Sequence, residues 1–224
     1  MILENLKKVE DQIGLSCVKC GRNRSEIRLI AVSKTQPVEI IKEAINAGLK
    51  DFGENKAQEL RDKSELIKGD FNWHFIGHLQ PNKIKYVIKT AEYIHAVDSK
   101  KLAEEINFKA VQINKKQNVL LEIKTSDEAT KFGLDNQKDI FDTADFCRQS
   151  SNLNLVGLMT MAPYTDNEKQ IRNCFIKLRE MKDILNRNGF DLYELSMGMT
   201  NDFNIAIEEG ATLIRIGTAI FGVR

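Results

Sequence analysis

Leu195-Ser196-Met197-Gly198-Met199-Thr200-Asn201-Asp202 is one of two similar stretches near the C-terminus of this 224-residue chain. The other is Leu213-Ile214-Arg215-Ile216-Gly217-Thr218, which follows one short helical stretch. Each is an apolar run that ends in glycine and a hydroxyl, a pattern that presents backbone N–H groups and a hydroxyl to a phosphate. Because phosphate sites in (β/α)₈ barrels commonly lie beside strands seven and eight, the pair predicts the last two strands of such a barrel.

Eight short apolar runs alternate with amphipathic stretches along the chain. The runs cover residues 27–32, 51–53, 73–77, 93–97, 119–123, 155–161, 195–198 and 213–217. Most are apolar at consecutive positions, as expected for strands that are buried on both faces of a parallel sheet. Strand–helix alternation repeated eight times predicts an α/β fold, the (β/α)₈ TIM barrel. An open doubly wound sheet is the alternative, but no GxGxxG motif follows the first run.

Apolar residues spaced three or four positions apart predict helices between the strands. The predicted inner faces are Val38, Ile41, Ala44 and Ile45; Ala57, Leu60 and Ile67; Ile84, Val87 and Ile88; Leu102, Ile106 and Val111; Ile140, Phe141, Ala144 and Cys147; Ile171, Cys174, Phe175, Leu178, Met181 and Leu185; and Phe203, Ala206 and Ile207. Glu208-Glu209 is interpreted as the solvated end of the last of these helices.

The two ends of the chain are predicted to complete the barrel together. Only Phe221-Gly222-Val223-Arg224 remains after the eighth strand region, so we expect the last barrel helix to be missing. Ile2, Leu6, Val9 and Ile13 predict an amphipathic helix within residues 1–16, which we expect to cover the gap. Three prolines and no Gly/Pro/Ser-rich linker predict a single domain over residues 1–224.

Composition narrows the partners. With 33 basic and 32 acidic residues, the net charge of +1 gives no reason to expect a nucleic acid or a membrane as partner. No apolar run approaches the roughly 20 residues of a membrane span, and the N-terminus shows no export signal, so we expect a cytoplasmic protein. We also expect a monomer. Cys17-Val18-Lys19-Cys20 has no second cysteine pair to complete a zinc site, and we interpret its thiols as incidental.

Ala31-Val32-Ser33-Lys34-Thr35 places a lysine where the first apolar run stops. A phosphate cradle together with a lysine at a strand end suggests a phosphorylated carbonyl ligand. Pyridoxal 5′-phosphate (PLP) is the leading candidate, held as a Schiff base on Lys34. A solvent-exposed lysine without a special role is the alternative.

Other polar residues in apolar runs have two interpretations each. Arg215 lies inside a strand region, where an unpaired buried guanidinium is costly. It either pairs with a carboxylate such as Glu54 or Glu122, or donates to the pyridine nitrogen of the cofactor in the barrel mouth. His74 and His78 form an H-x₃-H pattern, which we interpret as packed or hydrogen-bonded histidines rather than as a metal site.

Six motifs together resemble the YggS/PROSC family of pyridoxal phosphate homeostasis proteins. The motifs are Ala31-Val32-Ser33-Lys34-Thr35, Phe52-Gly53-Glu54-Asn55, Trp73-His74-Phe75-Ile76-Gly77-His78-Leu79-Gln80 with Asn82-Lys83, Gly157-Leu158-Met159, Ser196-Met197-Gly198-Met199-Thr200-Asn201-Asp202 and Arg215-Ile216-Gly217-Thr218-Ala219-Ile220-Phe221-Gly222. The match runs in order from about residue 27 to the C-terminus. The chain departs from the family at Thr200 and Asn201, where serine and aspartate are frequent.

The resemblance implies a barrel like the N-terminal domain of alanine racemase, with PLP as cofactor. It implies a Schiff base on Lys34, a ring contact from Arg215 and a place for Asn55 in the same pocket. The implied phosphate contacts are Met199, Thr200, Gly217 and Thr218. No catalytic residue and no metal ligand is implied.

Three functions are compatible with these features. The resemblance implies intracellular PLP homeostasis, in which the protein holds the cofactor and delivers it to apo-enzymes without significant turnover. An amino-acid racemase is the alternative, but racemisation needs two bases, and of the four tyrosines that could supply the second base only Tyr164 stands at an obvious predicted strand end. A phosphosugar aldolase is the third possibility, although its Schiff-base lysine usually lies on a later strand.

Overall fold

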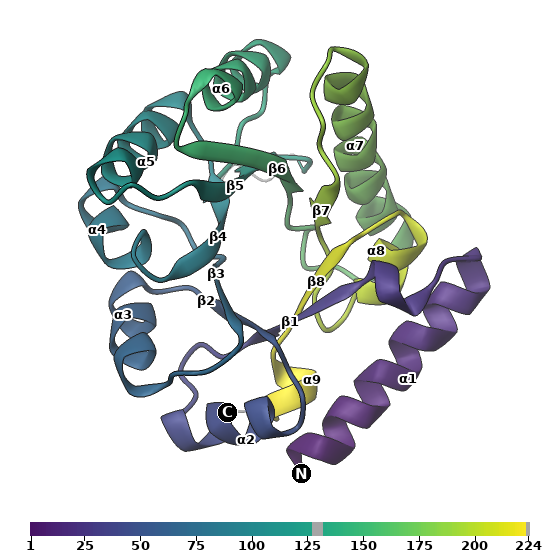
Figure 1. Ribbon diagram of the computed structural model, residues 1–224. Coiled ribbons are helices and arrows are strands. Elements are labelled where there is room, and N and C mark those ends of the chain that lie inside the picture. Colours follow the sequence, from purple (N-terminus) through teal and green to yellow (C-terminus); the bar gives the residue numbers. More distant parts are fainter. Residues whose placement is uncertain (127–131, 223–224) are drawn as a thin grey trace.

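Eight parallel strands close into a barrel in the computed structural model, which describes residues 1–126 and 132–222 (Figure 1). The strands are β1 (Arg28–Val32), β2 (Asp51–Glu54), β3 (Asn72–Phe75), β4 (Ala91–Val97), β5 (Gln117–Glu122), β6 (Leu153–Met159), β7 (Glu194–Ser196) and β8 (Leu213–Ile216). Each overlaps one of the predicted apolar runs. The (β/α)₈ prediction is confirmed, and the open doubly wound sheet is wrong. Val223 and Arg224, the end of the predicted domain, lie outside the described residues.

The barrel closes by pairing of its first and last strands. Strands β1 and β8 run parallel, with Ile30 opposite Arg215 and Ala31 opposite Ile216. On its other side, β1 pairs with β2, with Val32 opposite Gly53. All the carboxyl ends of the strands therefore lie at one mouth of the barrel, where the segments after β1, β2 and β8 become neighbours.

Nine α-helices within the described residues surround the barrel (Figure 1). They are α1 (Ile2–Cys20), α2 (Val38–Asn46), α3 (Ala57–Leu66), α4 (Ile84–Val87), α5 (Lys100–Gln112), α6 (Gln137–Gln149), α7 (Glu168–Arg187), α8 (Phe203–Glu208) and α9 (Thr218–Phe221). Ser99, Asn136 and Asn167 cap α5, α6 and α7, since each side chain accepts a hydrogen bond from a first-turn N–H. Of the described helices, none has the length and apolar character needed to cross a bilayer.

Two predictions about helix faces are wrong. Val111 is 53% exposed because the inner face of α5 turns through Ile106 and Ala110 instead. Glu208 and Glu209 at the end of α8 are mostly buried, because α8 packs between α1 and α7. Their carboxylates are satisfied by ion pairs to Arg172, Arg179 and Lys19 rather than by water.

Helix α1 covers the side of the barrel at which the chain returns to β1. Ile2, Leu6, Val9 and Ile13 are buried as predicted, and the helix continues beyond residue 16 to Cys20. It packs against α8 and α9, and Figure 1 shows it running diagonally beside them. The prediction that no helix follows the eighth strand is wrong, because α9 forms a single turn there.

Hydrogen bonds fasten α1 to the far end of the sequence. Asn5 Nδ2 donates to the carbonyl of Ile220 at 3.0 Å, and Ser16 Oγ donates to Asn204 Oδ1 at 2.9 Å. Cys17, the first thiol of the CxxC motif, is buried against this interface, and Cys20 is half-buried. Helix α1 is thus packed and hydrogen-bonded as part of the barrel wall.

The substitution Ile13→Ala should destabilise the whole barrel, because Ile13 is completely buried between α1 and its neighbours. We expect a loss of about 2–5 kcal/mol of unfolding free energy, measured by chemical denaturation. Leu15→Ala is the matched control, since Leu15 is 70% exposed on the same helix. Equal effects of the two substitutions, or unchanged melting after deletion of residues 1–14, would contradict a structural role for α1.

Candidate functional site

A cavity of about 810 Å³ opens at the carboxyl ends of the strands. The seven residues predicted from the sequence to form a site all line it: Lys34, Asn55, Met199, Thr200, Arg215, Gly217 and Thr218. They come from the ends of β1, β2, β7 and β8, which are far apart in sequence. The cavity therefore lies where the active face of a (β/α)₈ barrel is found.

Charged residues on α3 hold the turn that carries Lys34. Thr35 has a left-handed backbone (φ 63°), and its N–H donates to Glu59 Oε1. Lys63 Nζ lies 2.6 Å from Glu59 Oε1 and 2.7 Å from Glu54 Oε1 at the end of β2. Lys63 and Glu54 are both buried, so this ion-pair cluster is shielded from solvent. It fixes the backbone on either side of Lys34, and nothing in the sequence motifs indicated it.

Thr200 and Thr218 bring two hydroxyls together at the edge of the cavity. Their oxygen atoms lie 3.4 Å apart, although they belong to turns after different strands. Thr218 also begins the four-residue helix α9, in which the N–H groups of Ile220 and Phe221 donate to the carbonyl oxygen of Gly217 at 2.9 Å. Hydroxyls and backbone N–H groups are donors suited to a phosphate. This part of the cavity fits the phosphate cradle that the sequence predicts.

Two glycines allow these turns to approach the cavity. Gly198 has a positive φ of 95°, and a Cβ there would lie 2.6 Å from the Cβ of Ala206. A Cβ on Gly217 would lie 3.3 Å from the carbonyl oxygen of Val32. The conformation of the first turn thus requires glycine, and the second has little room for a side chain.

Met199 and Asn55 lie at different walls of the same cavity. The N–H of Met199 donates to Asp202 Oδ1 at 2.5 Å, which closes the turn before α8. Asn55 Oδ1 is buried, and among the residues that the structure describes no donor reaches it. A buried amide oxygen without a partner is unusual in a folded protein and is a group that a ligand could satisfy.

Arg215 is almost completely buried (4% exposed) at the floor of the cavity. Its Nη1 donates to Ser196 Oγ at 2.6 Å, and its Nη2 donates to the carbonyl oxygen of Thr160 at 2.9 Å. Burial lowers the pKa of Arg215 to about 10, so the guanidinium still carries its charge at neutral pH. Its hydrogen bonds thus go to neutral acceptors rather than to Glu54 or Glu122, the carboxylates suggested from the sequence.

Glu122 ends β5 as a buried carboxyl group. Burial and, to a smaller extent, the nearby Asp98 raise the pKa of Glu122 to about 7, while Arg215 opposes the shift. A substantial fraction of this carboxyl is therefore protonated at neutral pH. Arg215 thus acts on Glu122 through its charge, while its hydrogen bonds go to Ser196 and Thr160.

The two histidines of the H-x₃-H pattern lie in different surroundings. His74 is buried, and its ring nitrogens lie 2.9 Å from Asp51 Oδ1 and from His95 Nε2. His78 stacks on Phe132 with 3.9 Å between ring centres, and its Nδ1 lies 3.2 Å from Asp98. The interpretation of His74 as a hydrogen-bonded histidine is confirmed. Across residues 1–126 and 132–222, no cluster of three histidine, cysteine, aspartate or glutamate side chains is suited to a metal ion.

His95 is the site-related residue that the sequence analysis missed. It lies in β4 two positions after Tyr93, so both side chains point to the same face of the strand. Its Nδ1 lies 2.9 Å from Ser196 Oγ, the group that also accepts from Arg215. The sequence did contain a signal for His95, since it is a histidine within an apolar run and an aromatic residue, Tyr93, lies two positions before it.

The segment after β6 forms the outer wall of the cavity. Met161, Tyr164 and Asp166 line it. Tyr164, the tyrosine that the sequence places near a strand end, is 94% exposed. It borders the cavity, and nearly all of its side chain faces solvent.

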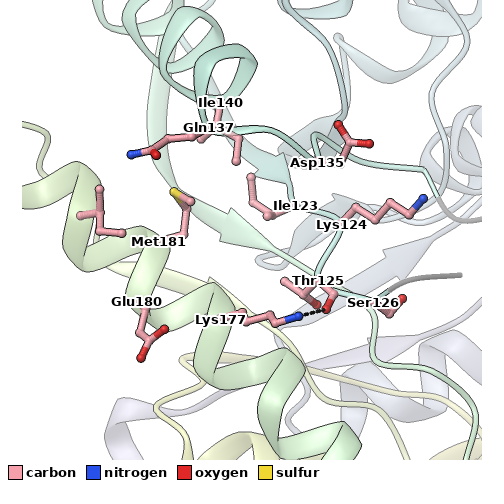
Figure 2. Close-up of a pocket in the computed structure, with 11 residues that line it drawn as sticks. Ile123, Lys124, Thr125, Ser126, Asp135, Gln137, Ile140, Lys177, Glu180 and Met181 are labelled. Atoms are coloured by element: carbon pink, nitrogen blue, oxygen red, sulfur yellow. Dashed lines mark hydrogen bonds between the residues drawn. The ribbon is translucent and has the colours of Figure 1, made fainter.

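A second cavity, of about 590 Å³, lies outside the barrel between the end of β5, α6 and α7 (Figure 2). Lys177 Nζ on α7 lies 3.5 Å from the carbonyl oxygen of Thr125 at its edge. Ile140 and Met181 contribute apolar surface from the two helices. None of the seven predicted site residues lines this cavity, so the barrel mouth is the candidate functional site.

Comparison with known proteins shows the family to which the chain belongs. The family described as "Alanine racemase, N-terminal domain" matches residues 18–224. A "Pyridoxal phosphate homeostasis protein" of Aquifex aeolicus is 44% identical over 225 residues, which are 99% of this chain and 97% of the relative. The solved structure of PipY from Synechococcus elongatus PCC7942 with PLP bound has a TM-score of 0.87 and 33% identity, over 99% of this chain and 100% of PipY.

A more distant likeness concerns the fold. Alanine racemase of Clostridium difficile 630 has a TM-score of 0.79 and 16% identity, over 99% of this chain and 57% of the racemase. The barrel is thus shared with the racemases, while the sequence is much closer to the homeostasis proteins. The chain therefore belongs to the alanine racemase N-terminal domain family and, within it, to the YggS/PROSC family of pyridoxal phosphate homeostasis proteins.

Proposed function

We propose that this protein binds PLP in the cavity at the barrel mouth and serves PLP homeostasis by holding the cofactor and delivering it. The observation that carries the proposal is that one cavity gathers Lys34, the Thr200 and Thr218 hydroxyls, and Arg215. A relative of 44% identity bears the name of a PLP homeostasis protein, and PipY is known with PLP bound. These likenesses support the proposal independently of the geometry.

Each residue has a defined task in this proposal. PLP supplies an aldehyde, an aromatic ring and a phosphate when it is bound. Lys34 Nζ is the amine for the Schiff base, and its turn is held by the ion-pair cluster of Lys63. Thr200 and Thr218 donate to the phosphate, and the turns at Met199 and Gly217 flank it, while the N–H of Met199 itself donates to Asp202. Asn55 stays at the cavity wall.

Arg215 limits what the bound cofactor can do. A guanidinium is a donor at neutral pH, so beside the pyridine nitrogen it would leave that nitrogen unprotonated. An unprotonated ring withdraws electrons less strongly and stabilises a carbanion poorly. Lys34 also provides only one base, whereas racemisation needs one on each face of the substrate carbon. We therefore infer a carrier without significant turnover rather than a racemase.

The remaining features of the proposal concern its surroundings. We infer that residues 1–224 form a single PLP-binding domain that works as a cytoplasmic monomer. The recipients of the cofactor would be apo-enzymes that use PLP. The nearly balanced charge of the chain supports a small-molecule role without nucleic acid or membrane partners.

The substitution Lys34→Ala should abolish covalent attachment of PLP and leave the fold intact, because Lys34 lies at the rim of the barrel. After borohydride reduction, mass spectrometry should find the cofactor on the peptide containing Lys34 in the wild type and on no peptide of the variant. Lys50→Ala is the control, since Lys50 pairs with Asp70 at the opposite end of β2. A reduced adduct that persists in Lys34→Ala would assign the attachment to another lysine.

The double substitution Thr200→Ala/Thr218→Ala should weaken retention of PLP. A hydrogen bond to a charged group contributes about 1–3 kcal/mol, so we expect a roughly five- to hundredfold loss of affinity per site in equilibrium dialysis. Thr200→Ser/Thr218→Ser keeps both hydroxyls and should retain most of the affinity. Unchanged affinity for PLP in the double alanine variant would show that the phosphate does not bind at these turns.

The loaded protein should transfer PLP to an apo-enzyme but should not racemise amino acids faster than free PLP does. The measurement is incubation with L-alanine in deuterated water, followed by chiral chromatography and by NMR of the α-position. Tyr164→Phe tests the one tyrosine at the cavity. The racemase interpretation would be correct if the wild type formed D-alanine faster than free PLP does and if this activity were lost in both Lys34→Ala and Tyr164→Phe.

A further inference from the structure

A chain of hydrogen bonds crosses the barrel interior from Asp51 to Arg215. Asp51 Oδ1 lies 2.9 Å from His74 Nε2, and His74 Nδ1 lies 2.9 Å from His95 Nε2. His95 Nδ1 lies 2.9 Å from Ser196 Oγ, which accepts from Arg215 Nη1 at 2.6 Å. These residues come from β2, β3, β4, β7 and β8, and each is at most 7% exposed.

The chemistry at both ends fixes the direction of every bond. Arg215 can only donate, so Ser196 Oγ accepts from it. Hydrogen bonds from His74 and Asn72 lower the pKa of Asp51 despite its burial, so at neutral pH this carboxylate only accepts and His74 Nε2 donates to it. Burial lowers the pKa of both histidines, that of His95 strongly, so each ring is neutral and carries one proton.

The middle of the chain follows from these two ends. A neutral His74 that donates through Nε2 has an unprotonated Nδ1, which accepts from His95 Nε2. His95 then has an unprotonated Nδ1, which accepts the hydroxyl proton of Ser196. All four bonds therefore point from Arg215 toward Asp51. The ring of Tyr93 stacks on His74 with 4.7 Å between centres and 2° between planes, which holds the imidazole in this orientation.

We propose that Asp51, His74, His95 and Ser196 form a one-way hydrogen-bond relay that positions the Arg215 guanidinium at the floor of the mouth cavity. The relay leaves Arg215 one preferred orientation, because the Ser196 proton is donated to His95 Nδ1 and turning the guanidinium away would leave the buried Ser196 Oγ without its donor. Asp51, far from Lys34 at the other end of the barrel, thereby acts as a positioning residue for the ligand. The effect on PLP binding rests on the function proposed above, whereas the relay itself does not.

The first test is NMR of ligand-free protein labelled with ¹⁵N at histidine and arginine. The chain has only three histidines, so long-range ¹H–¹⁵N spectra can assign each tautomer. We expect His74 and His95 to carry their protons on Nε2 alone, and the Arg215 guanidinium to rotate slowly about its Cζ–Nε bond. A proton on Nδ1 of either histidine, or a mixture of tautomers, would overturn the proposal.

The variants then separate a relay from simple local contacts. Asp51→Asn keeps the size but lets the amide donate or accept, so His74 should lose its single tautomer and Arg215 should rotate faster. Ser196→Ala should free Arg215 while His74 keeps its Nε2 proton. Ser16→Ala is the matched control, because Ser16 is a buried serine of α1. Its hydroxyl lies 2.9 Å from the carbonyl oxygen of Gln12 and 2.9 Å from Asn204 Oδ1 on α8. An Arg215 rotation rate unchanged by Asp51→Asn would show that positioning stops at Ser196.

Ligand binding provides the second readout. Affinity for PLP in Asp51→Asn should fall roughly two- to tenfold, the effect of one weakened hydrogen bond, while Ser16→Ala should match the wild type. If Arg215 rotated faster in Asp51→Asn but the affinity for PLP stayed unchanged, the relay would have no role in binding the ligand. If the wild type itself took up no PLP, the proposed function would fail, and the NMR result on the ligand-free protein would still decide the relay.

Discussion

The pairing of β1 with β8 is the constraint on which the site depends. Its register sets Ile30 opposite Arg215 and so brings the turn of Lys34 beside the turn of Gly217 and Thr218. In an open sheet of the same strand order these two strands would be the edges, and the amine and the phosphate cradle would lie at opposite sides of the molecule. The amine of Lys34 and the phosphate cradle lie at the same end of the barrel because all strands run parallel. The chemistry of the mouth is therefore a consequence of the topology.

The barrel interior is divided between two kinds of packing. One part is an apolar cluster, Ile30, Ala96, Leu120, Val156, Met159 and Leu213. The other is the polar chain that ends at Arg215. Replacing buried polar networks by apolar residues often stabilises a protein, so such a network is weak evidence for stability. Its retention here fits a functional demand, because a charged guanidinium at the floor of the cavity needs acceptors beneath it.

The strands were predictable because they depend on local apolar patterns, and the turns that end in glycine and a hydroxyl pointed to a phosphate site, whereas the full set of seven cavity residues was implied by the family resemblance. Runs such as 119–121 are apolar at consecutive positions, and parallel strands bring their ends to one mouth. His95 was missed because its partners come from strands that are distant in sequence, so no local spacing connects it to Ser196. Glu208 and Glu209 were misjudged for the same reason, since their arginine partners lie on another helix.

The position of α1 has a consequence for how the chain folds. Helix α1 is synthesised before α8 and α9, yet it packs mainly against these two helices, which lie about 190 residues later in the chain (Figure 1). Until those segments leave the ribosome, the apolar stripe of α1 lacks most of its native partners, since only α2 and the turn at residues 24–26 are available earlier. Contacts of such high sequence separation are slow to form and leave apolar surface exposed to aggregation. Docking of α1 is thus a late event, and the barrel wall closes only when nearly the whole chain is available.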